Sequence, residues 1–298
     1  MSRWPVLGSR VSMRFRQADG GQTDVIGHLC ALTPLITLRT KTDGMVSISP
    51  DDVVAVRELS HTPIRASEIR SLEHAAALAW PGTEQHWHNG WLLRAGGGHT
   101  SRANSAVPLD FSSSIADVND IVSWYDERGL EPWLALPDRL VRVRHEGVKQ
   151  TRVMVRDLDP AGVNTATTLD ARPDAAWLAC YQREVPQEVL TAVIDGEVVF
   201  ASVAGAAVGR GAVTSAPDGT VWLGISAVHV TDTHRRSGYA TAVCGALQTW
   251  GRDHGAQRVY VEVLDDNHAA AALYASLGFG LHHRHRYVDA RQLLTTSL

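Results

Sequence analysis

Residues 228–241 read VHVTDTHRRSGYAT, in which an apolar strand pattern passes through a short polar turn into the start of a helix. Within this stretch, Arg235, Gly238 and Ala240 fit the pattern R-x-x-G-x-A. A helix start offers free backbone N–H groups and the positive end of the helix dipole, and both attract anions. Gly238 and Ala240 let a phosphate approach those N–H groups, and the arginines add positive charge. The stretch therefore predicts a pyrophosphate-binding loop, with an ordinary strand-to-helix turn as the alternative.

A second group of polar residues follows in the next strand and helix. The alternation over residues 258–264 predicts a strand that places Glu262 on the face opposite its apolar neighbours. Asn267 opens the next predicted helix, and Tyr274 lies two turns further along the same face. Each has an ordinary alternative, because a solvated strand residue, a helix N-cap and a core tyrosine would show the same pattern. The two groups together are stronger evidence for a functional site than any one of these residues.

In this order, the two groups resemble the GNAT superfamily of N-acetyltransferases over about residues 189–288. The second group, EVLDDN at residues 262–267 followed by ALYASLGF at residues 272–279, is most similar to the branch that acetylates protein N-terminal amines, notably on ribosomal proteins. The resemblance implies acetyl-CoA as the acetyl donor and a primary amine on a protein or small molecule as the acceptor.

The resemblance also implies a role for each matched residue. Asn267 would bond the pantetheine arm, Tyr274 would protonate the departing thiolate and Glu262 would take a proton from the amine. The remaining coenzyme contacts would come from a splayed strand and the phosphate loop: Val228, His229, Val230, Arg235, Arg236, Ser237, Gly238, Tyr239, Ala240 and Thr241. Asp232 stands where the family often has proline, and Ala240 where it usually has glycine, but neither change removes a backbone donor.

The chemistry of acetyl transfer is consistent with these roles. An amine must lose a proton before it attacks a thioester, and a carboxylate such as Glu262 can accept that proton directly or through water. The alternative, from a different class, is a non-catalytic module that binds coenzyme A and uses its N-terminal part to engage nucleic acid or protein. The presence of both Glu262 and Tyr274 favours the enzyme.

Around these two groups, strand and helix patterns alternate over residues 151–298, which predicts a mixed α/β catalytic domain. Its predicted helices cover residues 236–254 and 267–277. Its predicted strands cover residues 189–195, 198–204, 207–214, 221–230, 258–264 and 281–288.

Residues 65–150 suggest a degenerate acetyltransferase-like segment without a phosphate loop of its own. The pattern predicts a helix from residue 66, a hairpin around Gly96-Gly97-Gly98, a helix over residues 117–128 and a strand over residues 132–136. We expect this segment to wall off the acceptor site. Its candidates for acceptor contacts are Trp87, Trp91 and Arg94.

Residues 1–60 predict a small SH3-like or Sm-like β-barrel, because five short strand patterns are separated by turn signals. Residues 61–63 form the expected linker. The basic residues of this part suggest a solvated face, with nucleic acid or a partner protein as the alternative: Arg10, Arg14, Arg16, Arg39 and Lys41.

Composition limits the remaining choices. The 298 residues are 44% hydrophobic and 20% charged, as in soluble globular proteins, and the net charge of −4 argues against non-specific nucleic-acid binding by the whole chain. No apolar run is long enough to span a bilayer, and the N-terminus lacks an apolar signal core, so we expect a cytoplasmic protein. The three cysteines are far apart, and neither of the pairs His86-x-His88 and His283-x-His285 has a nearby Cys, Asp or Glu in a recognised metal-binding pattern. We therefore expect no metal site.

Overall fold

The computed structural model describes residues 4–5, 7–17, 19–41, 44–59, 64–158 and 167–294. The chain divides into two compact units, Met1–Ile64 and Arg65–Leu298. The linker expected at residues 61–63 lies outside the described residues.

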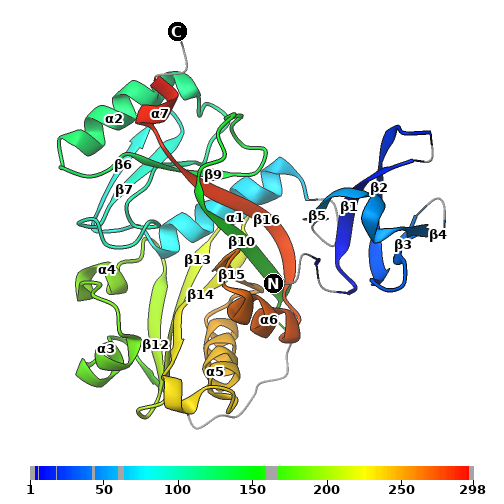
Figure 1. Ribbon diagram of the computed structural model, residues 1–298. Helices are drawn as coiled ribbons and strands as arrows, with labels where there is room; N and C mark the ends of the chain where they lie inside the picture. Colours follow the sequence, from blue (N-terminus) through cyan, green and yellow to red (C-terminus); the bar gives the residue numbers. More distant parts are fainter. Residues whose placement is uncertain are drawn as a thin grey trace. The chain divides into compact units, whose positions relative to one another are not determined.

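The first unit is an antiparallel sheet with the strand order β4-β3-β2-β1-β5 (Figure 1). In β1, Val11 and Met13 are fully buried whereas Arg14 is exposed, which is the two-residue period of a strand with one face in a core. The five expected strands are confirmed as β1 (Arg10–Arg16), β2 (Gln22–Ala31), β3 (Ile36–Thr40), β4 (Met45–Ile48) and β5 (Val53–Leu59).

The second unit is built on an eight-stranded sheet with the order β11-β12-β13-β14-β15-β10-β16-β9. All neighbouring strands are antiparallel except β14 and β15, which are parallel. The strands are β9 (Trp133–Pro137), β10 (Val148–Asp157), β11 (Thr168–Asp170), β12 (Glu197–Val203), β13 (Ala207–Ser215), β14 (Val221–Val230), β15 (Arg258–Leu264) and β16 (Gly280–Asp289).

Helices α1 (Ala66–Ala79) and α5 (Tyr239–Asp253) cover opposite faces of this sheet (Figure 1). On one face the Thr214 hydroxyl donates to the Ala75 carbonyl of α1 at 2.8 Å. On the other face a Cβ at Gly209 would lie 2.5 Å from the Val243 side chain of α5, so only glycine allows this close packing. The other helices are α2 (Val118–Asp126), α3 (Ala175–Tyr181), α4 (Gln187–Thr191), α6 (His268–Ser276) and α7 (Arg291–Leu294).

Residues 65–150 do not form a compact unit of their own. The boundary expected at residue 150 lies inside β10, and β9 pairs along β16 from Trp133↔Asp289 to Pro137↔His285. A second, three-stranded sheet carries the expected hairpin, with β6 (Glu84–His88), β7 (Trp91–Ala95) and β8 (Val107–Pro108). The segment is thus joined to the large sheet by strand pairing.

Two predicted elements differ from the structure. The strand predicted over residues 189–195 is wrong, because residues 187–191 form the short helix α4, entered through Pro186 as its N-cap. The helix predicted from Arg236 begins instead at Tyr239, because Gly238 adopts the left-handed conformation (φ 81°) and serves as its N-cap. The patterns of β6, β10, β11 and α3 were not recognised in the sequence.

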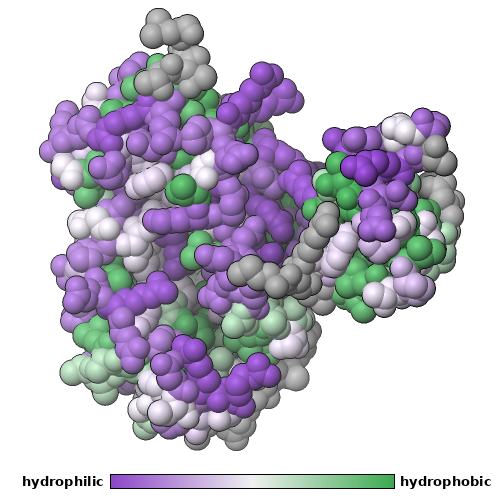
Figure 2. Space-filling model, in the orientation of Figure 1, coloured by the Kyte–Doolittle hydropathy of each residue, from purple (hydrophilic) through white to green (hydrophobic). Residues whose placement is uncertain are grey.

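Hydrophilic residues cover most of the face of the second unit that Figure 2 shows. Among the described residues, no helix is both long enough and apolar enough to cross a membrane.

The second unit should fold without residues 1–64, because its sheets and core clusters consist of residues from Arg65 onward. We expect residues 65–298 alone to unfold in one cooperative thermal transition followed by circular dichroism. By calorimetry, their affinity for acetyl-CoA should match that of the full chain. A folded, shortened chain that cannot bind acetyl-CoA would show that the site needs the first unit.

Candidate functional site

The parallel strands β14 and β15 separate halfway along their length. Their pairing runs from Trp222↔Arg258 to Ile225↔Val261 and then stops, although both strands continue. Just beyond this point Ala227 has a positive φ of 54°, and the pairing of β14 with β13 shifts register between Val208 and Arg210. This bulge turns β14 away from β15, so the backbone groups on its open side have no strand partner.

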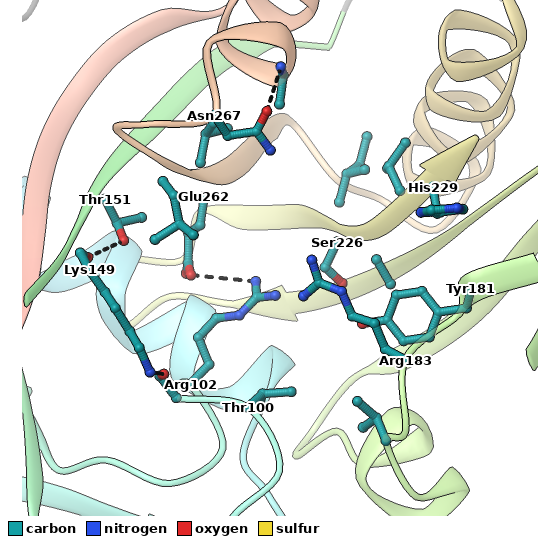
Figure 3. A pocket seen from close by; sticks show the side chains of 18 of the residues that line it. Thr100, Arg102, Lys149, Thr151, Tyr181, Arg183, Ser226, His229, Glu262 and Asn267 are labelled. Carbon is teal, nitrogen blue, oxygen red and sulfur yellow. Dashed lines mark hydrogen bonds and ion pairs between the residues drawn. The ribbon is translucent and has the colours of Figure 1, made fainter. Parts of the chain in front are cut away.

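A pocket of about 480 Å³ lies where the two strands separate (Figure 3). Five of the predicted site residues line it together: Val228, His229, Glu262, Asn267 and Tyr274. The other predicted coenzyme contacts lie outside its lining, further along β14 and at the start of α5: Val230, Arg235, Arg236, Ser237, Gly238, Tyr239, Ala240 and Thr241.

The loop before α5 has the geometry of an anion site. Arg236 and Gly238 both have positive φ, 63° and 81°, which turns the main chain into a concave bend. The Ala242 N–H donates to the Gly238 carbonyl, so the N–H groups of the three residues before Ala242 precede the first turn of helical bonding. Apart from the chain around Gly238 itself, no atom of the described residues lies within 4 Å of a Cβ built at this position, so an anion can approach. The Arg235 guanidinium lies 2.8 Å from Asp232 in an exposed ion pair.

Asn267 is the N-cap of α6, and its Oδ1 accepts a hydrogen bond from the Ala270 N–H at 3.1 Å. The ordinary explanation of this residue is therefore correct as far as its oxygen is concerned. Because the side-chain NH₂ group is a separate donor, the same residue can also bind a ligand carbonyl in the pocket that it lines.

Tyr274 lies on α6 and is 6% exposed. Its ring packs edge-on against Phe279, with centroids 5.5 Å apart. Burial, supported by the neighbouring Cys244, raises the pKa of Tyr274 well above its ordinary value. The phenol therefore stays protonated over the whole physiological range, as a proton donor must.

Glu262 points from β15 into the pocket, where its Oε2 lies 3.4 Å from Arg102 Nη1 (Figure 3). The carboxylate side chain is 9% exposed and the arginine side chain 27% exposed. Burial opposes the charge of Arg102, but the facing Glu262 carboxylate raises the pKa of the guanidinium above its usual value. Glu262 thus occupies a largely enclosed position with a permanent cation beside it.

His229 lies on the opposite side of the pocket from Glu262 (Figure 3). Its Nε2 is buried and has no hydrogen-bond partner among the described residues. Burial, together with the cations Arg235 and Arg183, lowers the pKa of His229. The imidazole is therefore neutral at physiological pH and could accept a proton.

Several pocket residues were not identified from the sequence, and most of them come from elements that the patterns did not reveal or from an irregular loop. Arg102 follows the triple-glycine turn, and the others lie on or beside β10, α3 and β16: Lys149, Thr151, Tyr181, Arg183 and Tyr287. The predicted acceptor contacts Trp87, Trp91 and Arg94 do not line the pocket. Trp91 is fully buried in a separate core cluster, and Arg94 is buried against Ser105.

The second histidine pair has an acidic partner that the sequence pattern did not reveal. Glu73 of α1, 210 positions away, places its Oε1 at 2.6 Å from His283 Nε2 and 3.3 Å from His285 Nδ1. These three donors lie within 4.8 Å of one another and are all buried, a set that could hold a divalent metal ion. Burial disfavours the carboxylate, but hydrogen bonds from both histidines outweigh it and hold the pKa of Glu73 well below its usual range.

In GNAT N-acetyltransferases, two parallel strands separate next to a helix whose N-terminus has the geometry of a phosphate-binding site. The second unit has this fold. It aligns with a GCN5-related N-acetyltransferase from Kribbella flavida with a TM-score of 0.53 at 14% identity, over 76% of this chain and 95% of that one.

Family comparisons agree with the fold. The model described as probable histone acetyltransferase Rv0428c C-terminal matches residues 66–288, and the Rv0428c N-terminal Sm-like domain matches residues 5–57. The chain is 46% identical to the probable histone acetyltransferase Rv0428c of Mycobacterium tuberculosis over 98% of both proteins. It is 26% identical to the uncharacterized N-acetyltransferase YobR of Bacillus subtilis, over 74% of this chain and 98% of the relative. The chain belongs to this Rv0428c family of GNAT-fold acetyltransferases, with a first unit of the Sm-like type.

Gly238→Glu should abolish most acetyl-CoA binding while leaving the fold intact, because the new side chain adds bulk and negative charge where an anion would bind. Calorimetry should show at least about a tenfold loss of affinity. Gly238→Asn is the matched control for backbone strain, since asparagine tolerates the left-handed conformation and carries no charge. An unchanged affinity in a folded Gly238→Glu variant would exclude this loop as the phosphate site.

Glu73→Gln should destabilise the protein, because it removes the buried negative charge with which His283 and His285 form hydrogen bonds. The lowered pKa of Glu73 contributes stability above its unfolded value of 4.5, and that contribution is lost as the pH falls through the folded pKa. The raised pKa of His285 contributes below its unfolded value of 6.5 and is lost as the pH rises through the folded pKa. The loss in the free energy of unfolding should therefore be largest between pH 4.5 and pH 6.5, at about 3–5 kcal/mol by urea unfolding.

Glu197→Gln provides the control for this substitution, because Glu197 forms a comparable but exposed pair with His254 at 3.6 Å. It should cost far less at every pH. Equal losses for the two variants would show that the buried cluster contributes no more than a surface pair.

Proposed function

We propose that this protein transfers the acetyl group of acetyl-CoA to a primary amine on a protein or small molecule, by direct attack of the amine on the thioester. The observation that carries the proposal is that Glu262, Asn267 and Tyr274 line one pocket at the point where β14 leaves β15. A non-catalytic coenzyme-binding module would need neither an enclosed carboxylate nor a protonated phenol at this point.

In the proposed complex, the pantetheine arm lies along the open side of β14 at Val228–Val230, whose unpaired backbone groups can bond its amides. The side-chain NH₂ of Asn267 donates to the arm from across the gap. The main-chain N–H groups of residues 236–241 receive the pyrophosphate, and the exposed arginines of this loop add positive charge.

The proposed reaction then requires two proton transfers. Glu262 accepts a proton from the amine, directly or through water, and the amine nitrogen bonds to the thioester carbon. Main-chain N–H groups on the open side of β14 stabilise the oxyanion that forms. As the carbon–sulfur bond breaks, Tyr274 protonates the departing thiolate. Holding the amine and thioester in attack geometry would supply about 7–11 kcal/mol of the barrier reduction.

We infer that residues 65–150 are a degenerate half of the same fold that closes the acceptor side. Two features support this inference. β9 continues the main sheet beside β16, and the loop after β7 brings Thr100, Ser101 and Arg102 to the pocket wall.

The two catalytic roles can be separated by Glu262→Gln and Tyr274→Phe, which keep the shape of each side chain. Each should lower kcat by about 10²–10⁴-fold. The acetyl-CoA dissociation constant should change only slightly, because neither role involves binding the coenzyme in the ground state. The activity of Glu262→Gln should recover towards high pH, where more of the amine is already deprotonated. Tyr274→Phe should be impaired over the whole physiological range, because burial holds the pKa of the wild-type phenol well above its ordinary value.

The measurement is the pH profile of kcat/KM for both variants with one amine acceptor, by a thiol-release assay. A wild-type profile for Glu262→Gln would place the base elsewhere, and His229, with its unpartnered Nε2, would be the next residue to substitute.

A further inference from the structure

Three guanidinium groups gather around Trp80, at the end of α1 behind the pocket. Arg102 and Arg210 lie 4.7 and 4.4 Å from the Trp80 ring, measured from the guanidinium carbon to the ring centroid. The Arg94 guanidinium donates to the Trp80 carbonyl at 3.4 Å. Arg94 and Arg210 are 4% and 1% exposed, so this positive charge is held largely away from water.

The carboxylates near these groups do not balance their charge. Arg210 donates to the carbonyls of Leu190, Ala79 and Ala192, and Arg94 donates to Ser105. Within the described part of the chain, Glu262 is the single carboxylate in ion-pair distance of any of the three, through Arg102. Carbonyl dipoles satisfy the donors but supply no net negative charge, so the pocket wall keeps an excess of positive charge.

This excess reaches the pocket through Arg102. Arg102 meets Glu262 in the pocket lining, and Lys149 lines the same pocket with its Nζ bonded to the Ser101 hydroxyl (Figure 3). The planar guanidinium has five N–H donors, and a single 3.4 Å ion pair leaves most of them available. A carboxylate is the group that such a fork binds best, because it can accept two parallel hydrogen bonds.

We propose that the acetyl acceptor carries a carboxylate as well as its amine, and that Arg102 and Lys149 bind this carboxylate while the amine faces Glu262. The inference rests on the function proposed above. Because Arg102 and Glu262 are only 3.4 Å apart, the amine and carboxylate of the acceptor are separated by only a few bonds, as in an amino acid. A strongly basic peptide would bring more positive charge to this wall, so we expect it to be a poor acceptor.

The test compares matched acceptors that differ only in charge. Free amino acids and their carboxamides present the same amine with and without the carboxylate, and a lysine-rich peptide represents the basic case. We expect kcat/KM to be about 10- to 100-fold higher for the acids than for the amides, with the peptide lower still. Thiol release gives the rate, and mass spectrometry identifies the acetylated product.

Three variants locate the effect. Arg102→Gln and Lys149→Gln should each reduce the ratio of acid to amide, chiefly through KM, whereas Arg102→Lys should keep part of it. Arg291→Gln is the control, because Arg291 is exposed and pairs with Asp126 and Glu131 away from the pocket. It should leave the ratio unchanged. Should Arg102→Gln fail to fold, the wild-type ratio and the exposed Lys149 still decide the question.

If the amides or the basic peptide are acetylated with the same kcat/KM as the acids, this inference is overturned. The proposed acetyltransferase function would still hold. An unchanged ratio in folded Arg102→Gln and Lys149→Gln would overturn the assignment of these residues. If acetyl-CoA binds but no amine of any charge is acetylated, the proposed function fails, and this inference fails with it.

Discussion

The end of the β14–β15 pairing at Ile225 and Val261 is the constraint on which the site depends. Strand backbone groups that lose their partner must be satisfied by water or by a ligand, because leaving them unpaired in a buried position is costly. The bulge at Ala227 creates such groups next to the start of α5 and opposite Glu262. One local departure from regular pairing therefore creates the pocket, the open strand and the approach to the phosphate loop.

The parts of the site that could be predicted are those that depend only on neighbouring residues in the sequence. Gly238 marks the loop because glycine adopts the left-handed backbone without strain, and Asn267 marks a helix start because its side chain caps α6. Tyr274 follows from helical spacing once that start is known. The bounds predicted for β14 and β15 accordingly match the structure, and those of α6 differ by one residue at each end.

The parts that could not be predicted depend on contacts between distant segments. Glu73 meets His283 from 210 positions away, and Arg102 reaches Glu262 from a loop with no regular pattern. Residues 189–195 include β-branched residues that are typical of a strand, but tertiary contacts favour the helix α4 at residues 187–191 instead. The carbonyls of Leu190 and Ala192 at the end of α4 receive the buried Arg210 side chain. No short window of sequence contains that information.

The order of strands also bears on self-association. A sheet can recruit strands from other chains at its two outermost members, and here both are short. β11 has three residues, and β9 has five and ends at Pro137, which offers no backbone N–H. The long strand β16 lies between β10 and β9, and β9 covers its residues 285–289. The segment that carries β9 therefore does more than wall the pocket: without it, residues 285–289 of β16 would be open to pairing with another copy of the chain.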